Sequence, residues 1–158
     1  MAKPAHEDFM DKRLRWMEEN VNGAYNAVHP QGHEQEGGHC TNSGTCILVC
    51  CYIEALGKVL TKGQLGSKAR FKEFLKVCMN DFLVESNART DLTLPGDELL
   101  YKVFRCGFVH GYPQAGFGWG RSGPPGKYWF IKGGCLTLHI DELVAGFKRG
   151  RDEFRKCA

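Results

Sequence analysis

Residues 46–53 constrain the fold of this chain more than any other stretch, because they read Cys-Ile-Leu-Val-Cys-Cys-Tyr-Ile and are apolar on every side. A helix that is apolar all round has to be surrounded by other elements instead of facing water. We therefore expect a helix over residues 45–62 at the centre of the packing, ended by Gly63. The chain of 158 residues is long enough to bury such a core as one domain, spanning residues 1–158.

Apolar residues also recur every three or four positions in several other stretches, which is the spacing of a helix with one buried face. In the first of them, Met10, Leu14 and Met17 begin such a stripe. Acidic residues directly after Pro95 suit the positive end of a helix dipole. Further helices are therefore expected over residues 6–28, from residue 67, from residue 95 and over residues 141–156.

The stretch from residue 127 to residue 140 has the pattern of a β-hairpin instead. Two apolar runs flank Gly133 and Gly134, which are typical of a two-residue turn. The expected fold class is therefore all-α: a small bundle of about five helices with a β-hairpin appended before the last helix. Long loops are expected over residues 29–44 and 113–126, which are rich in glycine.

The net charge of the chain, +3, is too small to mark a strongly basic nucleic-acid-binding protein, but its distribution is informative. No acidic residue occurs between Glu98 and Asp141, and aromatic residues are interleaved with cations over this interval. Cations beside aromatic faces suit a single-stranded nucleic acid, although core aromatics beside a solvated loop would give the same pattern. The cations are Lys102, Arg105, Arg121, Lys127 and Lys132.

The cysteines and the apolar runs indicate the compartment. The sequence has eight cysteines, but Cys46, Cys50 and Cys51 lie in the central apolar run, where a free thiol acts as a small hydrophobic side chain. No apolar leader begins the chain, so we expect a reducing, cytoplasmic location without disulfides. No uninterrupted apolar run approaches the length of a membrane span, so no membrane contact is expected.

Residues 99–113 contain the two side chains with the most chemical meaning. In this helix-like run, the guanidinium of Arg105 suits a phosphate, and the imidazole of His110 exchanges protons near neutral pH. On a straight α-helix the two side chains would lie about 140° apart and would not converge. Either Gly111 lets His110 leave the last turn, or two chains form the site together across a dimer axis. The simpler interpretations are a salt bridge for the arginine and a contact with the helix dipole for the histidine.

These features resemble the HEPN superfamily, whose members share an arginine and a histidine separated by four to six residues at a helix end. Here the motif reads Arg-Cys-Gly-Phe-Val-His over residues 105–110. Residues 52–58 resemble the acidic position on another helix of such proteins, and the resemblance spans about residues 40–113. It implies a helical bundle that works as a homodimer with the two motifs facing each other.

The resemblance also implies an activity, that of a metal-independent endoribonuclease that needs no cofactor. His110 would act as general acid or base on the RNA 2′-hydroxyl or on the leaving 5′-oxygen. Arg105 would stabilise charge on the phosphate, and the product would carry a 2′,3′-cyclic phosphate. Cys106 stands where catalytic members often have Asn, Asp or His, which favours a non-catalytic module that binds RNA or a nucleotide. A third interpretation is a toxin or defence component neutralised by an antitoxin-like protein partner.

Glu54 is the remaining catalytic candidate, because it is a lone carboxylate in a strongly apolar helix and an unpaired buried carboxylate is costly. Arg105 would be its partner if Glu54 faces the bundle, and Lys58 would be if it faces water. Further candidates are basic and aromatic side chains that would hold the RNA. These are Lys102, Tyr112, Trp119, Arg121 and Lys127.

The sequence predicts neither a metal site nor a phosphate-binding loop. Three histidines and a cysteine lie close together before the central helix: His29, His33, His39 and Cys40. They lack the Cys-x2-Cys pair that is typical of structural zinc sites. Gly116, Gly118 and Gly120 follow a helix and not a strand, so they lack the context of a dinucleotide-binding turn. We interpret them as a flexible segment that closes over a substrate.

Overall fold

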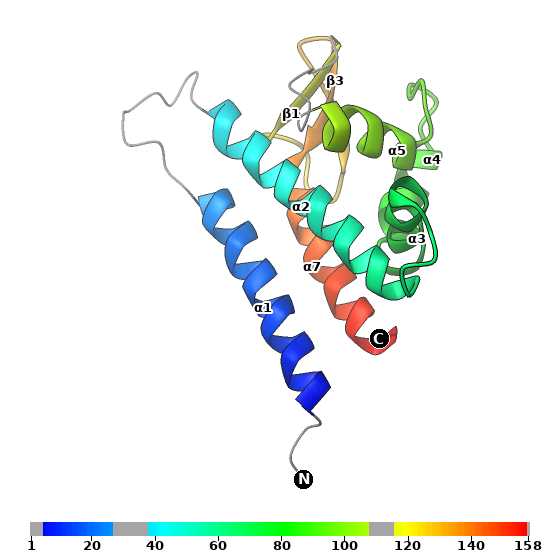
Figure 1. The fold of residues 1–158 in the computed structure, drawn as a ribbon. Coiled ribbons are helices and arrows are strands. Elements are labelled where there is room, and N and C mark those ends of the chain that lie inside the picture. Colours follow the sequence, from blue (N-terminus) through cyan, green and yellow to red (C-terminus); the bar gives the residue numbers. More distant parts are fainter. Residues whose placement is uncertain (1–4, 27–37, 108–115, 158) are drawn as a thin grey trace.

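The computed structural model describes residues 5–26, 38–107 and 116–157 and is mostly helical, with one three-stranded sheet (Figure 1). The helices are α1 (Ala5–Asn26), α2 (Gly38–Leu60), α3 (Ser67–Cys78), α4 (Asn80–Asn87), α5 (Gly96–Leu99), the π-helix η1 (Leu100–Cys106) and α7 (Ile140–Cys157). The strands are β1 (Phe117–Gly120), β2 (Trp129–Lys132) and β3 (Cys135–His139). Helices dominate as expected, but β1 adds a strand to the expected hairpin, so the fold is not purely α-helical.

The central position predicted for α2 is confirmed. It packs against α1, α3, α7 and η1, and Figure 1 shows it running between α1 and α3. Its buried side chains include Cys46, Val49, Cys50, Ile53 and Leu56. By length and composition alone, residues 42–60 would also qualify as a membrane span, with a mean hydropathy of 1.5. In the folded chain, 50% of that window is buried.

Both loop predictions are partly wrong. The loop expected over residues 29–44 ends at Gly38, where α2 begins, and the loop expected over residues 113–126 contains β1. A tertiary contact joins the two segments: Nε of Arg121, directly after β1, donates a hydrogen bond to Oδ1 of the buried Asn42 at 2.8 Å. The two residues are 79 positions apart, so local propensity did not predict this contact.

β3 is the central strand of the sheet and pairs antiparallel with β2 and parallel with β1. The β2–β3 hairpin is confirmed, because Gly133 and Gly134 have φ values of 58° and 78°, the left-handed backbone of a two-residue turn. β1 was not expected because its sequence, Phe-Gly-Trp-Gly, is typical of a loop. Gly118 lets β1 approach β3, since a Cβ there would lie 2.9 Å from Oγ1 of Thr137.

The helices expected from residues 67 and 95 are each divided in two. The first divides at Met79, whose φ of −131° and ψ of 45° are not helical, and forms α3 and α4. The second is α-helical only in α5 and continues as the π-helix η1, at whose end the N–H of Gly107 donates to the carbonyl of Lys102, five residues earlier. Short π-helical segments occur frequently at functional sites, and this one contains Arg105.

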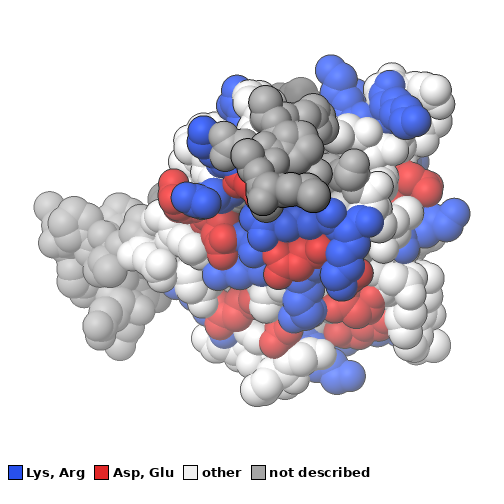
Figure 2. All heavy atoms as spheres, turned by 90° about the horizontal axis from the view of Figure 1, so that it is seen from below, with Lys and Arg blue, Asp and Glu red and all other residues white. Residues whose placement is uncertain are grey.

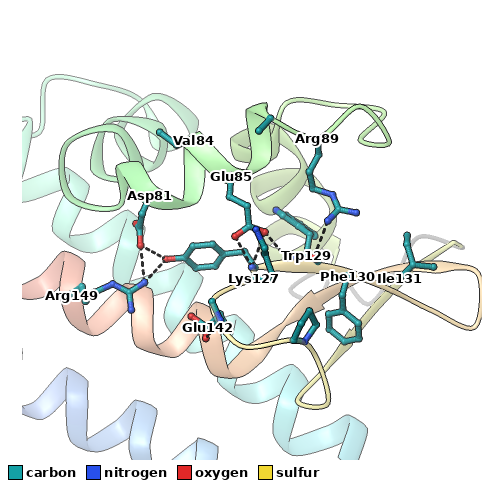
Figure 3. A pocket seen from close by; sticks show the side chains of 14 residues that line it. Asp81, Val84, Glu85, Arg89, Lys127, Trp129, Phe130, Ile131, Glu142 and Arg149 are labelled. Carbon is teal, nitrogen blue, oxygen red and sulfur yellow. Dashed lines mark hydrogen bonds and ion pairs between the residues drawn. The ribbon is translucent and has the colours of Figure 1, made fainter.

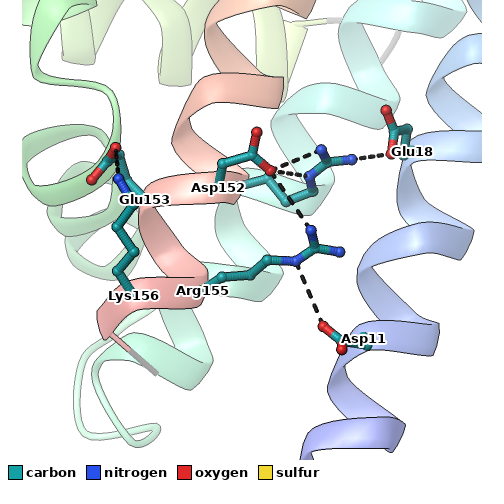
Figure 4. Close-up of polar contacts among 7 residues, drawn as sticks. Asp11, Glu18, Asp152, Glu153, Arg155 and Lys156 are labelled. Carbon is teal, nitrogen blue, oxygen red and sulfur yellow. Dashed lines mark hydrogen bonds and ion pairs between the residues drawn. The ribbon is translucent and has the colours of Figure 1, made fainter.

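An ion-pair network joins α1 to α7 (Figure 4). The guanidinium of Arg151, which is 7% exposed, contacts the carboxylates of Glu18 and Asp152, and Arg155 contacts Asp11 and Asp152. The face of the molecule seen in Figure 2 accordingly shows blue and red side chains interspersed, with no large area of one sign. Charges of both signs are mixed on this face, which is therefore not a basic surface.

α2 and α3 cross at Gly57 with almost no space between their backbones. A Cβ added to Gly57 would lie 2.1 Å from the carbonyl oxygen of Arg70, well inside van der Waals contact. Only a residue without a side chain permits this approach. The crossing brings the side chain of Arg70 close to Glu54, which lies one helical turn before Gly57.

Replacing Gly57 by alanine is expected to force α2 and α3 apart. We expect Gly57→Ala to lower the free energy of unfolding by about 1–3 kcal/mol, the usual cost of overpacking a tight contact. Urea denaturation monitored by circular dichroism measures this change.

Gly44→Ala is the matched control, because Gly44 lies in the same helix and a Cβ there meets nothing within 4 Å. We expect this variant to keep or raise stability, since alanine is the better helix former by roughly 1 kcal/mol. Equal effects of the two substitutions would show that the α2–α3 crossing is not tight.

Candidate functional site

One carboxylate and two guanidinium groups meet where α2, α3 and η1 pack together. Glu54 of α2 lies at the centre and is 8% exposed. Its Oε1 accepts hydrogen bonds from Nη2 of Arg70, at 2.6 Å, and from the hydroxyl of Ser67. Its Oε2 accepts hydrogen bonds from Nη2 and Nε of Arg105, at 2.7 and 3.0 Å. We call these four side chains the Glu54 cluster.

The contact between Glu54 and Arg105 was one of two alternatives left open by the sequence, and it is confirmed. The alternative, a surface pair with Lys58, is wrong: Lys58 is exposed and forms no ion pair within the described part of the chain. Both arginine side chains are 23% exposed, whereas the carboxylate side chain is 10% exposed. The cluster therefore presents the edges of two arginines at the surface with their shared carboxylate beneath.

The hydrogen bonds in the cluster keep Glu54 charged. Burial by itself would raise the pKa of Glu54, but the hydrogen bonds from Ser67, Arg70 and Arg105 outweigh burial, and the pKa lies below its usual value. Two guanidinium groups and one ionised carboxylate leave one net positive charge. Such a site favours an anion.

Arg105 is held from the other side by its own helix. Its guanidinium lies over the ring of Tyr101, 5.6 Å from the centroid, and Tyr101 packs edge-on against the buried Phe71. Its Nη1 has a weak contact of 4.0 Å with Sγ of Cys106. The carboxylate and the ring restrict the guanidinium to one orientation, which is a requirement for stabilising a particular charge geometry.

η1 buries one side of its surface against the core and leaves Arg105 half-buried. The buried residues are Leu100, Val103, Phe104 and, directly after η1, Gly107. η1 ends one residue after Arg105, so the predicted separation of about 140° between Arg105 and His110 stays a prediction. His110 lies outside the described residues.

The candidates for holding RNA do not gather into one site. Tyr112 lies outside the described residues, and Nζ of Lys102 is 3.2 Å from Oε2 of Glu98, its i,i−4 neighbour. Half-buried Trp119 belongs to β1 and packs against the core. Exposed Lys127 lies on the opposite side of β3 from β1, near β2.

Arg121 has a structural environment that contrasts with that of Arg105. It donates hydrogen bonds to Asn42 and to the carbonyl of Tyr25, and its guanidinium lies 3.9 Å from the centroid of the Tyr25 ring. These contacts hold the end of β1 against α1 and α2. We therefore no longer expect Arg121 to bind RNA.

Arg70 is the member of the Glu54 cluster that sequence reasoning missed. Position 70 lies on α3, sixteen residues from Glu54, and no motif includes it. The signal that was present is Gly57, a glycine inside a helix that is otherwise suited to larger apolar residues. A conformationally costly glycine in a helix indicates a close approach of another backbone, which here is that of Arg70.

A separate cleft of about 840 Å³ lies between α4 and the chain that leads into β2 (Figure 3). At one end, the hydroxyl of Tyr128 donates to Asp81 at 2.8 Å, and Nη2 of Arg149 contacts the same carboxylate oxygen at 2.7 Å. Burial, followed by the hydrogen bond to Asp81, raises the pKa of Tyr128. The charges at this end therefore satisfy one another.

Side chains of α4, and Arg89 just after it, also bind the backbone where the edge strand β2 begins. Glu85 accepts hydrogen bonds from the N–H groups of Tyr128 and Trp129, and Nη1 of Arg89 donates to the carbonyl of Trp129 at 2.9 Å. The indole of Trp129 donates to Oγ of the buried Ser86, also at 2.9 Å. These contacts satisfy backbone hydrogen-bonding groups at the start of an edge strand, which is a structural role for the cleft.

Among the side chains described, no group of three or more His, Cys, Asp or Glu residues is arranged to hold a metal ion. The histidines and the cysteine at positions 29, 33, 39 and 40 lie outside the part of the chain whose side chains are described. No protein-family model, curated protein or solved structure matches the chain. The Glu54 cluster is therefore interpreted from its own geometry.

The lowered pKa of Glu54 predicts a pH-dependent contribution to stability. Because the pKa is lower in the folded chain than in the unfolded chain, this contribution is present above about pH 4.5 and is lost as the pH falls through the folded pKa. We expect Glu54→Gln to reduce the free energy of unfolding at pH 7 by about 1–3 kcal/mol. The difference from the wild type should shrink as the pH is lowered from 7 towards 3, as measured by urea denaturation.

Glu73→Gln is a suitable control, since Glu73 lies on α3 and forms no ion pair among the described residues. This variant should follow the wild type at every pH. A Glu54→Gln difference that stays constant between pH 7 and pH 3 would contradict the assignment.

Proposed function

We propose that this chain is a metal-independent endoribonuclease of the HEPN type that works as a homodimer. The observation that carries the proposal is the ion pair between Arg105 and Glu54, which joins residues 51 positions apart. It fixes the arginine of the motif in one orientation beside a net positive charge. A fixed guanidinium is what stabilisation of a phosphate transition state requires.

In the proposed reaction, His110 takes the proton from the RNA 2′-hydroxyl, and the resulting oxygen attacks the adjacent phosphorus. The bond from phosphorus to the 5′-oxygen breaks, and the partner's His110 donates a proton to that oxygen. Arg105 stabilises the charge that develops on the phosphate oxygens. The products are a 2′,3′-cyclic phosphate and a 5′-hydroxyl, so protons and electrons balance without an external reagent.

η1 ends at Cys106, directly after Arg105, and His110 lies outside the described residues. The pairing of the two side chains therefore rests on the resemblance and on the fixed orientation of Arg105. The reaction needs one group that takes a proton and another that donates one at the same time. A homodimer supplies both, because each chain contributes one His110.

A non-catalytic module that binds RNA through the same cluster is the second candidate. Cys106 favours it, since its thiol contacts Arg105 at the position where members of the resembled family often carry Asn, Asp or His. A thiol is a weaker hydrogen-bonding group than these side chains.

The test is cleavage of end-labelled single-stranded RNA in EDTA by the wild type, His110→Ala and Arg105→Gln. We expect the wild type to leave 2′,3′-cyclic phosphate ends. His110→Ala should lose roughly 10²-fold or more in rate, because general acid–base catalysis typically contributes that much. Arg105→Gln should lose about 10²–10³-fold, as expected for removing a donor to developing charge.

Arg89→Gln is the control, because it also removes a paired arginine but lies in the α4–β2 cleft, away from the Glu54 cluster. It should cleave like the wild type. RNA binding without cleavage would favour the non-catalytic module, and loss of cleavage only in EDTA would indicate a metal-dependent enzyme. If the wild type neither binds nor cleaves RNA, the proposal is refuted.

A further inference from the structure

Arg70 has more hydrogen-bonding capacity than its contact with Glu54 uses. Among the described residues, only Nη2 of its guanidinium is engaged, at 2.6 Å from Oε1 of Glu54. Its Nε is buried and has no hydrogen-bond partner among the described residues. A buried donor without a partner is uncommon in a native protein and calls for an explanation. The side chain is nevertheless 23% exposed, so part of the guanidinium is accessible from outside.

The orientation of Arg70 relative to Arg105 is determined by their shared carboxylate. Each arginine binds a different oxygen of Glu54, so the two guanidinium groups must lie side by side. The tight crossing of α2 and α3 at Gly57 positions one of them, and η1 positions the other. Two guanidinium groups with donors unused by Glu54 match the geometry of an anion with two oxygens.

We propose that Arg70 is a second phosphate-binding residue, so that one phosphodiester group contacts Arg105 with one non-bridging oxygen and Arg70 with the other. This inference rests on the proposed function in that it takes Arg105 as a phosphate-binding group. It deepens that function by specifying the ligand. The single net positive charge of the cluster balances the single negative charge of a phosphodiester, so a chain phosphate is a better match than a doubly charged terminal phosphate.

Glu54 has a defined part in this arrangement. It positions both arginines, but its negative charge also opposes the phosphate. Replacing it with glutamine keeps a hydrogen-bond acceptor at that position and raises the net charge by one unit. Binding of a phosphodiester is therefore expected to strengthen in Glu54→Gln, while the loosened orientation of Arg105 lowers the rate of cleavage.

The experiment measures binding of fluorescently labelled single-stranded DNA by anisotropy at several salt concentrations. DNA has the phosphodiester but no 2′-hydroxyl, so binding is separated from cleavage. We expect Arg70→Gln and Arg105→Gln each to weaken binding several-fold at low salt. Each should also flatten the slope of log K against log salt by about 0.7, the value for losing one phosphate contact on a single strand.

Lys72→Gln is the matched control, because it removes one cation from the same helix as Arg70 but on the side paired with Asp97 and Glu98. It should leave the slope nearly unchanged.

Arg70→Lys covers the case in which Arg70→Gln is poorly folded. It retains the charge and the slope but loses the planar fork, so its affinity should lie between those of the wild type and Arg70→Gln. Circular dichroism checks the fold of each variant.

The outcomes separate the two proposals. If Arg105→Gln flattens the slope and Arg70→Gln behaves like Lys72→Gln, the inference about Arg70 is wrong and the proposed function stands. If both arginine variants flatten the slope but RNA is not cleaved, the phosphate site stands and the ribonuclease does not. If the wild type binds no DNA, or all three variants behave alike, the inference is overturned.

Discussion

The geometry of the proposed site depends on one partly sheltered carboxylate, that of Glu54. Charge at this position is tolerated only because Ser67, Arg70 and Arg105 donate hydrogen bonds to it. In satisfying the carboxylate, these side chains tie α3 and η1 to the central helix. The hydrogen bonds that offset the cost of burying the charge of Glu54 thus also orient Arg70 and Arg105 at the surface.

At the sheet, too, polar groups that need hydrogen-bond partners determine how the elements are placed. β2 is an edge strand, and Glu85 of α4 and Arg89 bind the backbone groups of Trp129 at its start. Arg121 similarly holds the end of β1 against the first two helices. These contacts attach the sheet to the bundle, and they explain why Arg121 is not available to a ligand.

The pairing of charges changes the meaning of the interval between Glu98 and Asp141. The sequence shows only cations there, but Lys102 pairs with Glu98, at the start of the interval, and Arg105 pairs with Glu54, far before it. These two ion pairs weaken the positive field that the linear pattern suggested. The Glu54 cluster keeps one net positive charge because two arginines share one acid.

The sequence by itself determined most of the helices, the central position of α2 and the β-hairpin, because periodicity and turn residues are local signals. The cost of burying a lone carboxylate also limited the partner of Glu54 to Arg105 or Lys58, and the structure decided between them. Only the tertiary structure decided the early start of α2, the strand β1, the π-helical winding of η1 and the place of Arg70. Each of these depends on a contact or a close approach between segments distant in sequence. Such contacts outweigh local propensity, and no short stretch of sequence records them.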